Sequence, residues 1–181
     1  MLRFKSNPEK IVNVMAFFAE RCHGCTKMKL FKLMYFADKE HLLRHGRPIT
    51  GDRYVRMEYG PTPSSSYDMA KGNAPSRETA LFQSKLAVSG NTIKALHSAD
   101  MKVFSRSDEK ILVEIIEKLG RKTAAQLSVM SHKEAAWGRT PENQIINFEL
   151  MFEGRPDAKL TLELLRQEIE QTPDASKAAR S

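Results

Sequence analysis

The chain has 181 residues, of which 41% are hydrophobic and 28% are charged, and its formal net charge is +7. This length and balance suit one ordinary globular domain with a core of its own. Residues 1–21 lack the uninterrupted apolar stretch of a secretory signal, and no segment approaches the roughly 20 apolar residues that span a bilayer. We therefore expect a cytoplasmic protein with no membrane partner.

Most of the positive charge lies between Arg21 and Arg56, where nine basic residues stand against three acidic ones. Such a region favours an acidic partner surface or nucleic acid. A solvated helix face rich in lysine explains the same pattern equally well.

Hydrophobic spacing predicts two helices at the start of the chain. Asn7 caps the first helix, and Gly24 ends it. Thr26 caps the second helix, which Gly46 ends. Apolar side chains recur every three or four residues in both, so each helix buries one face.

The apolar period changes to two over residues 54–59, which predicts a strand that Gly60 and Pro61 end. A short helix follows, capped by one of the serines at 64–66 and ended by Gly72. Two or three short strands are expected over residues 79–105, with a turn at residues 89–91.

The rest of the chain favours helices. Ser107 caps a helix that Gly120 ends, and two capping boxes predict further helix starts at Thr123–Gln126 and Ser131–Glu134. Residues 140–154 are ambiguous and could hold a strand, whereas residues 157–171 form an amphipathic helix.

These elements predict an α+β fold, a mostly helical single domain over residues 1–171 with a small antiparallel sheet. Residues 172–181 are small and polar, and we expect them to form a disordered tail.

Cys22 and Cys25 are the only cysteines, spaced as in half of a zinc site or in a redox motif. The histidines that could complete a zinc site begin at His41, about 24 Å further along a helix. A redox motif normally follows a strand, whereas a helix precedes this pair. We therefore favour a space-filling turn between helices and expect no metal and no cofactor.

No phosphate-binding loop and no hydrolase motif occurs in the chain. Asp38, Glu40 and His41 cluster on the second predicted helix, and a small nuclease or hydrolase could use such a set. A structural pair of Asp38 with His41 explains the cluster more simply, so we expect no enzymatic activity and no catalytic residue. We assign His132 a structural role beside Trp137, which we expect to be buried.

Residues 19–36 have the outline of a helix-turn-helix, with a basic second helix. That helix is long and carries a strong apolar stripe, which favours a core helix. A basic DNA-binding regulator is an alternative function that this pattern leaves open.

A set of fixed residue types runs in order from the second predicted helix into the following turn and strand. Its members, called the motif below, are Lys29, Leu30, Lys32, Leu33, Tyr35, Ala37, Asp38, Gly51, Asp52, Tyr54, Gly60 and Pro61. In these residues the chain resembles the Panacea antitoxin domain of the SocA-like family, and the resemblance extends roughly from Pro8 to Trp137. Thr62 departs from the pattern, since the family usually has a bulky apolar residue after Gly-Pro. We interpret the motif as fold-defining.

The resemblance implies a bacterial or phage-borne antitoxin that binds and neutralises a protein toxin encoded by a neighbouring gene. One family member resembles a proteolytic adaptor, which delivers its toxin to an ATP-dependent protease. For partner contact we single out Arg47, Arg53, Arg56 and Tyr59, because arginine and tyrosine are favoured binding anchors.

Overall fold

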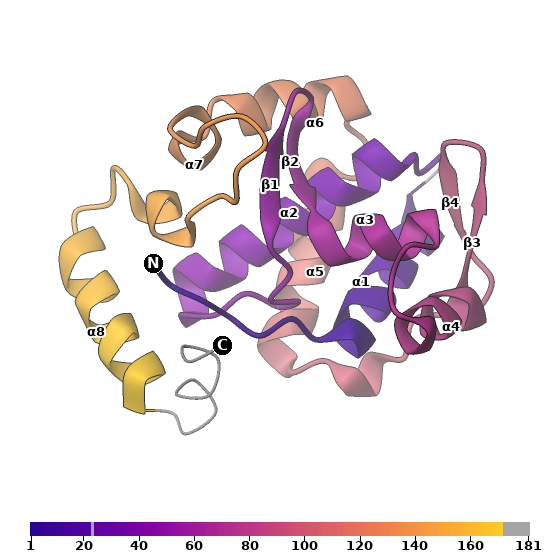
Figure 1. The fold of residues 1–181 in the computed structure, drawn as a ribbon, viewed down its shortest axis with the longest axis horizontal. Coiled ribbons are helices and arrows are strands. Elements are labelled where there is room, and N and C mark those ends of the chain that lie inside the picture. The colour runs from indigo at the N-terminus through magenta and orange to yellow at the C-terminus, as the bar shows by residue number, and fades with distance from the viewer. Residues whose placement is uncertain (23, 172–181) are drawn as a thin grey trace.

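The computed structural model describes residues 1–22 and 24–171, so the expected tail over residues 172–181 lies outside the described part of the chain. Within these ranges, eight α-helices and two short β-hairpins form the mostly helical α+β fold that the sequence predicts (Figure 1). None of the described helices combines the length and apolarity that crossing a membrane requires.

The helices are α1 (Pro8–Arg21), α2 (Lys27–His45), α3 (Ser64–Lys71), α4 (Ser76–Lys85), α5 (Arg106–Leu119), α6 (Ala124–His132), α7 (Ala135–Gly138) and α8 (Ala158–Gln171). The strands are β1 (Tyr54–Met57), β2 (Gly60–Pro63), β3 (Leu86–Ser89) and β4 (Thr92–Ala95). Two 3₁₀ turns, η1 (Met101–Val103) and η2 (Phe148–Phe152), complete the set.

Helix α2 runs through the middle of the molecule, with α1, α5, α6 and β2 packed around it (Figure 1). Every residue from Lys29 to Asp38 is buried, so this part of the helix is enclosed on all sides. The alternative of a solvated lysine face is therefore wrong for Lys29 and Lys32. Their amines instead donate to carbonyl oxygens, of Gly120 at 2.7 Å and of Pro61 at 2.8 Å, because a buried ammonium needs acceptors.

Several predicted helix caps are confirmed. Asn7 accepts a hydrogen bond from the backbone of Lys10, and Thr26 does the same for Lys29. The capping box from Thr123 to Gln126 is also present. Local side-chain chemistry was enough to locate these helix starts.

Two other predicted caps are wrong. Ser105 rather than Ser107 caps α5, because the carboxylate of Asp108 three residues later completes a capping box with Ser105. Ser131 does not start a helix: it lies inside α6, where its hydroxyl donates to the carbonyl of Ser128 at 2.8 Å. The spacing of polar residues in the sequence does not distinguish a serine that caps a helix from a serine within a helix.

The two hairpins are β1–β2 and β3–β4, both antiparallel. The predicted turn at residues 89–91 is confirmed, but residues 79–85 belong to helix α4 rather than to a strand. This helix begins directly after Pro75 and carries Glu78 in its first turn, which favours a helix start. Residues 140–154 contain the turn η2 and one bridge, Ile145 to Val55, instead of a strand.

Candidate partner-binding site

The apolar members of the motif form the core between α2 and the β1–β2 hairpin. Leu30, Leu33 and Ala37 are no more than 1% exposed. The Tyr35 ring meets the Tyr54 ring edge to face at 5.3 Å. These side chains therefore hold the hairpin against α2, as expected for fold-defining residues.

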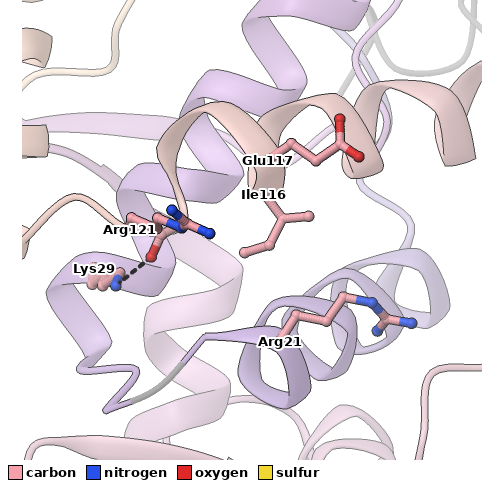
Figure 2. Close-up of a pocket in the computed structure, with 6 residues that line it drawn as sticks. Arg21, Lys29, Ile116, Glu117 and Arg121 are labelled. Atoms are coloured by element: carbon pink, nitrogen blue, oxygen red, sulfur yellow. Dashed lines mark hydrogen bonds between the residues drawn. The ribbon is translucent and has the colours of Figure 1, made fainter.

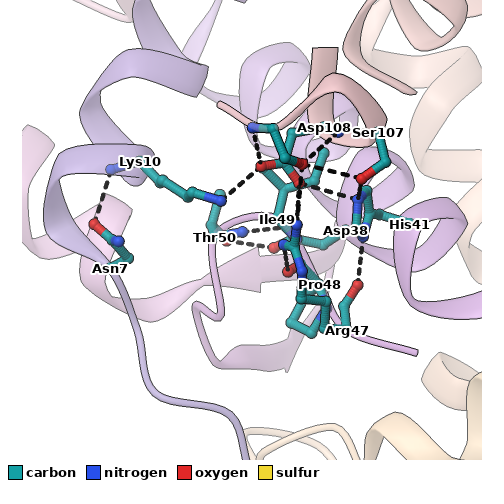
Figure 3. A network of polar contacts seen from close by, with 11 residues as sticks. Asn7, Lys10, Asp38, His41, Arg47, Pro48, Ile49, Thr50, Ser107 and Asp108 are labelled. Atoms are coloured by element: carbon teal, nitrogen blue, oxygen red, sulfur yellow. Dashed lines mark hydrogen bonds and ion pairs between the residues drawn. The ribbon is translucent and has the colours of Figure 1, made fainter. Parts of the chain in front are cut away.

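Asp38 ties the segment after α2 back onto that helix (Figure 3). Its carboxylate accepts hydrogen bonds from the backbone of Ile49 at 2.8 Å and of Thr50 at 2.9 Å, and from the Tyr54 hydroxyl at 2.9 Å. The Thr50 hydroxyl is a further donor. Burial raises the pKa of Asp38 to about 6 although these donors favour the charged form. Asp38 is thus a structural residue with its acceptor sites occupied.

Asp52 caps helix α3 from a distance. Its carboxylate accepts from the backbone nitrogens of Ser65 and Ser66, both at 2.9 Å, and from the Ser66 hydroxyl at 2.7 Å. The residue at the N-cap position is Pro63, whose side chain makes no capping bond. The prediction that one of the serines caps this helix is therefore wrong, and a residue from the preceding loop performs that task.

A second buried carboxylate, Asp108, joins four segments of the chain (Figure 3). Lys10 donates to it at 2.6 Å, Arg47 at 2.9 Å, and the Nε2 atom of His41 lies 3.0 Å away. Burial alone would favour the neutral acid, but the hydrogen bonds from His41, Lys10 and the Ser105 backbone and the charge of Arg47 lower the pKa of Asp108 well below its usual value. This network fixes α1, α2 and α5 relative to one another.

Asp38, Glu40 and His41 do not form one site. Asp38 and His41 are both fully buried and bind different partners. Glu40 forms an ion pair with Arg44 one turn further along α2. The cluster that suggested a nuclease or hydrolase therefore separates into three structural interactions.

The two cysteines flank the turn between α1 and α2. Both are thiols buried in the core, at 4% and 2% exposure. The hydrogen bond with Cys22 and burial raise the pKa of Cys25 above its usual value, which disfavours a reactive thiolate. Across residues 1–22 and 24–171, no group of three or more His, Cys, Asp or Glu side chains is placed to hold a metal ion.

A cavity of about 620 Å³ opens beside this turn, between the C-terminal ends of α1 and α5 (Figure 2). Arg21, Lys29 and Arg121 line it together with Glu117. The Lys29 amine holds the Gly120 carbonyl, and Arg21 donates to the Phe17 carbonyl at 3.2 Å. These two cations therefore cap helix ends, where positive charge is stabilising.

Many cations of the basic region between Arg21 and Arg56 form ion pairs with carboxylates of the same chain. Lys39 pairs with Glu134, Arg44 with Glu40 and Glu114, and Arg47 with Asp108. Lys29 and Lys32 are buried. Several of the cations that the sequence concentrates in this region are therefore buried or ion-paired in the described part of the chain.

A polar seam lies between α2, the β1–β2 hairpin and the α6–α7 region. We define it as Lys32, Tyr35, Arg56 and His132. Lys32 is only 2% exposed, and burial lowers its pKa to about 8. Burial, followed by the Glu134 charge, raises the pKa of Tyr35. The sequence places Lys32 and Tyr35 in the fold-defining motif, and only the packing of α6 brings His132 near the charge of Lys32.

The ring of Trp137 organises the outer end of this seam. His132 stacks on it with ring centroids 4.0 Å apart, as predicted, and the guanidinium of Arg56 lies 4.4 Å above it. Its indole nitrogen donates to the Met57 carbonyl at 3.2 Å. Trp137 is half-buried, so the expectation of a buried tryptophan is wrong.

Exposed apolar side chains surround the tip of the β1–β2 hairpin, and we call them the hairpin rim: Met57, Tyr59, Val129 and Ile145, between 39% and 58% exposed. Nearby bonds hold the hairpin against its neighbours: the Ser128 hydroxyl of α6 donates to the Tyr59 carbonyl at 2.8 Å, and Ile145 forms a bridge with Val55 of β1. Exposed aromatic and apolar groups beside an arginine are typical of protein-binding surfaces.

The four residues singled out for partner contact do not meet in one place. Arg56 and Tyr59 lie on the hairpin, and exposed Arg53 directly precedes β1. Arg47 lies apart, bonded to Asp108 and Ser105 at the start of α5. Of the four, Arg56 and Tyr59 therefore belong to the same hairpin, and Tyr59 is part of the rim.

The comparisons with known proteins point to one family. Residues 30–138 match the family described as "Antitoxin SocA-like, Panacea domain". The searches of curated proteins and of solved structures each return no match. The matched segment contains α2 from Leu30 onward, both hairpins and α3 to α7, and it includes the motif from Leu30 onward. Because the match spans more than half of the chain, the protein belongs to the SocA-like antitoxin family with a Panacea domain.

Proposed function

We propose that this protein is the antitoxin of a toxin–antitoxin pair and neutralises a protein toxin by binding it. Membership of the antitoxin family supports this function. The observation that carries it at the level of residues is the hairpin rim beside Arg56. Aromatic, methionine and arginine side chains are enriched where protein partners bind, and a few such anchors supply most of the affinity.

Neutralisation on this proposal requires no chemistry from the antitoxin. The buried carboxylates Asp38 and Asp108 hold the fold together, and the exposed hairpin supplies the contact. The partner is the toxin encoded by a neighbouring gene, and both proteins meet in the cytoplasm.

A rescue experiment in bacteria tests the proposal. Each neighbouring gene is induced alone and then together with this protein, surviving colonies are counted, and the tagged protein is recovered with whatever it binds. Relief of growth arrest with the neighbour co-purifying is the expected result. A neighbour whose level falls on co-expression indicates delivery to an ATP-dependent protease, whereas the absence of any toxic neighbour and of any bound protein contradicts the proposal.

Variants locate the contact. We expect Tyr59→Ala and Arg56→Ala each to weaken toxin binding by about 30-fold, the effect of losing an interface anchor worth about 2 kcal/mol. Arg77→Ala in α4 and Val88→Ala in β3 are matched controls, since both residues are exposed and lie on other elements. Equal binding by all four variants would place the toxin on a different surface.

A further inference from the structure

The polar seam contains hydrogen-bonding groups that the free chain leaves unused. Among the residues that the structure describes, three buried side-chain atoms have no hydrogen-bond partner: Tyr35 Oη, Arg56 Nε and His132 Nε2. All three belong to the seam. Buried polar groups are almost always paired, because an unpaired one loses its water without compensation. Three such atoms at one junction therefore need an explanation.

Shared neighbours connect the side chains that carry these atoms. Lys32 and Tyr35 are one turn apart on α2, so they share a face. The charges of Lys32 and Arg56 both lower the pKa of His132, after burial as the main cause. The Trp137 ring contacts both side chains: His132 stacks on it, and the Arg56 guanidinium lies over it.

The seam offers mainly donors. Tyr35 has a hydroxyl, Arg56 has its Nε–H, and Lys32 is an ammonium group with a single acceptor in the structure, the Pro61 carbonyl. His132 donates to the backbone carbonyl of Glu58, and burial lowers its pKa, so its Nε2 becomes a donor only when a bound negative charge favours the protonated ring. Glu134 is the acidic side chain whose charge reaches Tyr35, but it is paired with Lys39. A ligand that satisfies the seam must therefore supply acceptor oxygens and negative charge.

We propose that the polar seam binds one side-chain carboxylate of a protein partner, which accepts hydrogen bonds from Arg56, Tyr35 and His132. The partner is a protein because the hairpin rim around the seam is apolar and aromatic rather than basic. On the proposed function, on which this step rests, the carboxylate belongs to the toxin. The site gives a specific polar anchor at the centre of an apolar contact, where desolvated charged pairs contribute most.

A partner carboxylate reaches the seam only if the hairpin tip moves, because the three unpaired atoms are buried. The tip is held to α6 by the bond from Ser128 to the Tyr59 carbonyl and to α7 by the bond from Trp137 to the Met57 carbonyl. The second bond is at the surface. A partner that covers Met57 and Tyr59 can replace these contacts as its carboxylate enters.

Tyr35→Phe is the decisive variant, because it removes one unpaired hydroxyl and keeps the ring against Tyr54. We expect unchanged or higher stability together with about 10-fold weaker toxin binding, the loss of one hydrogen bond to a charged group. Tyr54→Phe is the matched control: it removes a hydroxyl that is bonded to Asp38, so it lowers stability and leaves toxin affinity unchanged. Arg56→Lys keeps the charge but not the Nε–H, and we expect a loss similar to that of Tyr35→Phe.

A second measurement does not depend on the toxin. The melting temperature of the wild-type chain is compared in sodium acetate and in sodium chloride at equal ionic strength, because a ligand of the folded state raises it. We expect acetate to stabilise the wild-type chain and not the Tyr35→Phe or Arg56→Lys variants. Phosphate raising the melting temperature more than acetate, with duplex DNA competing, would overturn the assignment in favour of nucleic acid.

The experiments can contradict the carboxylate site and the antitoxin function independently of each other. Wild-type toxin affinity in Tyr35→Phe, together with no acetate effect on the wild-type chain, overturns the carboxylate site and leaves the antitoxin function standing. An acetate effect that Tyr35→Phe abolishes, in a protein that binds no neighbouring gene product, supports the site and contradicts the antitoxin function.

Discussion

Lys32 shows how a single residue of the motif can oppose the stability of the fold. Its ammonium lies beside Gly60 and Ser131 with one carbonyl acceptor, and burial lowers its pKa from 10.5 to about 8. The unfolded chain therefore binds more protons than the folded chain between these two pH values. The free energy of unfolding must rise with pH across this window, by up to about 3 kcal/mol.

We expect Lys32→Met to raise the free energy of unfolding at pH 7 by about 1 to 2 kcal/mol, because the desolvation of the charge outweighs the lost bond to Pro61. The rise in stability from pH 8 to about 10 should disappear in this variant. Urea denaturation at a series of pH values measures both effects. Lys39→Met, which removes an ion-paired lysine of the same helix, should keep the rise. A Lys32→Met variant that is less stable at pH 7 would contradict this account.

Asp52 stabilises the fold by capping helix α3, although it lies in the loop before β1 and outside that helix. We expect Asp52→Ala to lower the free energy of unfolding by about 2 to 4 kcal/mol, because two backbone nitrogens at the start of α3 and the Ser66 hydroxyl lose their acceptor. Ser64→Ala, at the first position of the same helix, should change it by less than about 0.5 kcal/mol. Chemical denaturation compares the two, and equal effects would show that Asp52 is not the cap.

At the scale of the elements, the β1–β2 hairpin depends on Gly60, the first residue of β2 after the turn. The residue has φ +100°, and a Cβ there would lie 2.7 Å from Lys32 Cε and closer still to Ser131 Oγ. The hairpin can therefore sit against α2 and α6 only if this position has no side chain.

We expect Gly60→Ala to cost about 2 to 4 kcal/mol of stability through strain and overpacking together. Gly72→Ala should cost about 1 kcal/mol, since its φ is also positive, at +75°, but no atom lies within 4 Å of the added Cβ. Thermal denaturation separates the two variants. Similar costs would mean that the close approach of α2 and α6 contributes nothing to the requirement for glycine.

At the scale of the whole molecule, the net charge of +7 does not tell how many cations are free to bind a partner. Several cations of the basic region are buried or paired with carboxylates in the described residues, so they are not free to bind phosphates. Helix α2, the candidate recognition helix, is enclosed by its neighbours and cannot enter a DNA groove.

Binding to DNA should accordingly be weak and sequence-independent. We expect a dissociation constant of about 10⁻⁵ M or weaker for a duplex at about 150 mM salt. Fluorescence anisotropy at several salt concentrations measures the affinity and its salt dependence. Submicromolar binding with a steep slope, near −0.9 per phosphate contact, would instead restore the DNA-binding alternative.

The sequence by itself determined the features that arise within a few residues of one another. Helices α1 and α2, their caps Asn7 and Thr26, and the turn of the β3–β4 hairpin follow from local spacing and capping chemistry. The motif from Leu30 to Pro61 identified the family for the same reason, since it is a continuous pattern along the chain.

Only the tertiary structure decided which polar residues act together. Asp52 caps a helix that begins twelve residues later, Asp108 binds Lys10 from across the sequence, and Lys32 is buried by elements that follow it in the chain. In the polar seam, Lys32 likewise lies near His132, a hundred positions further along the chain. These partners are far apart in sequence, and the free energy that selects them comes from burial, which no local pattern of residues encodes.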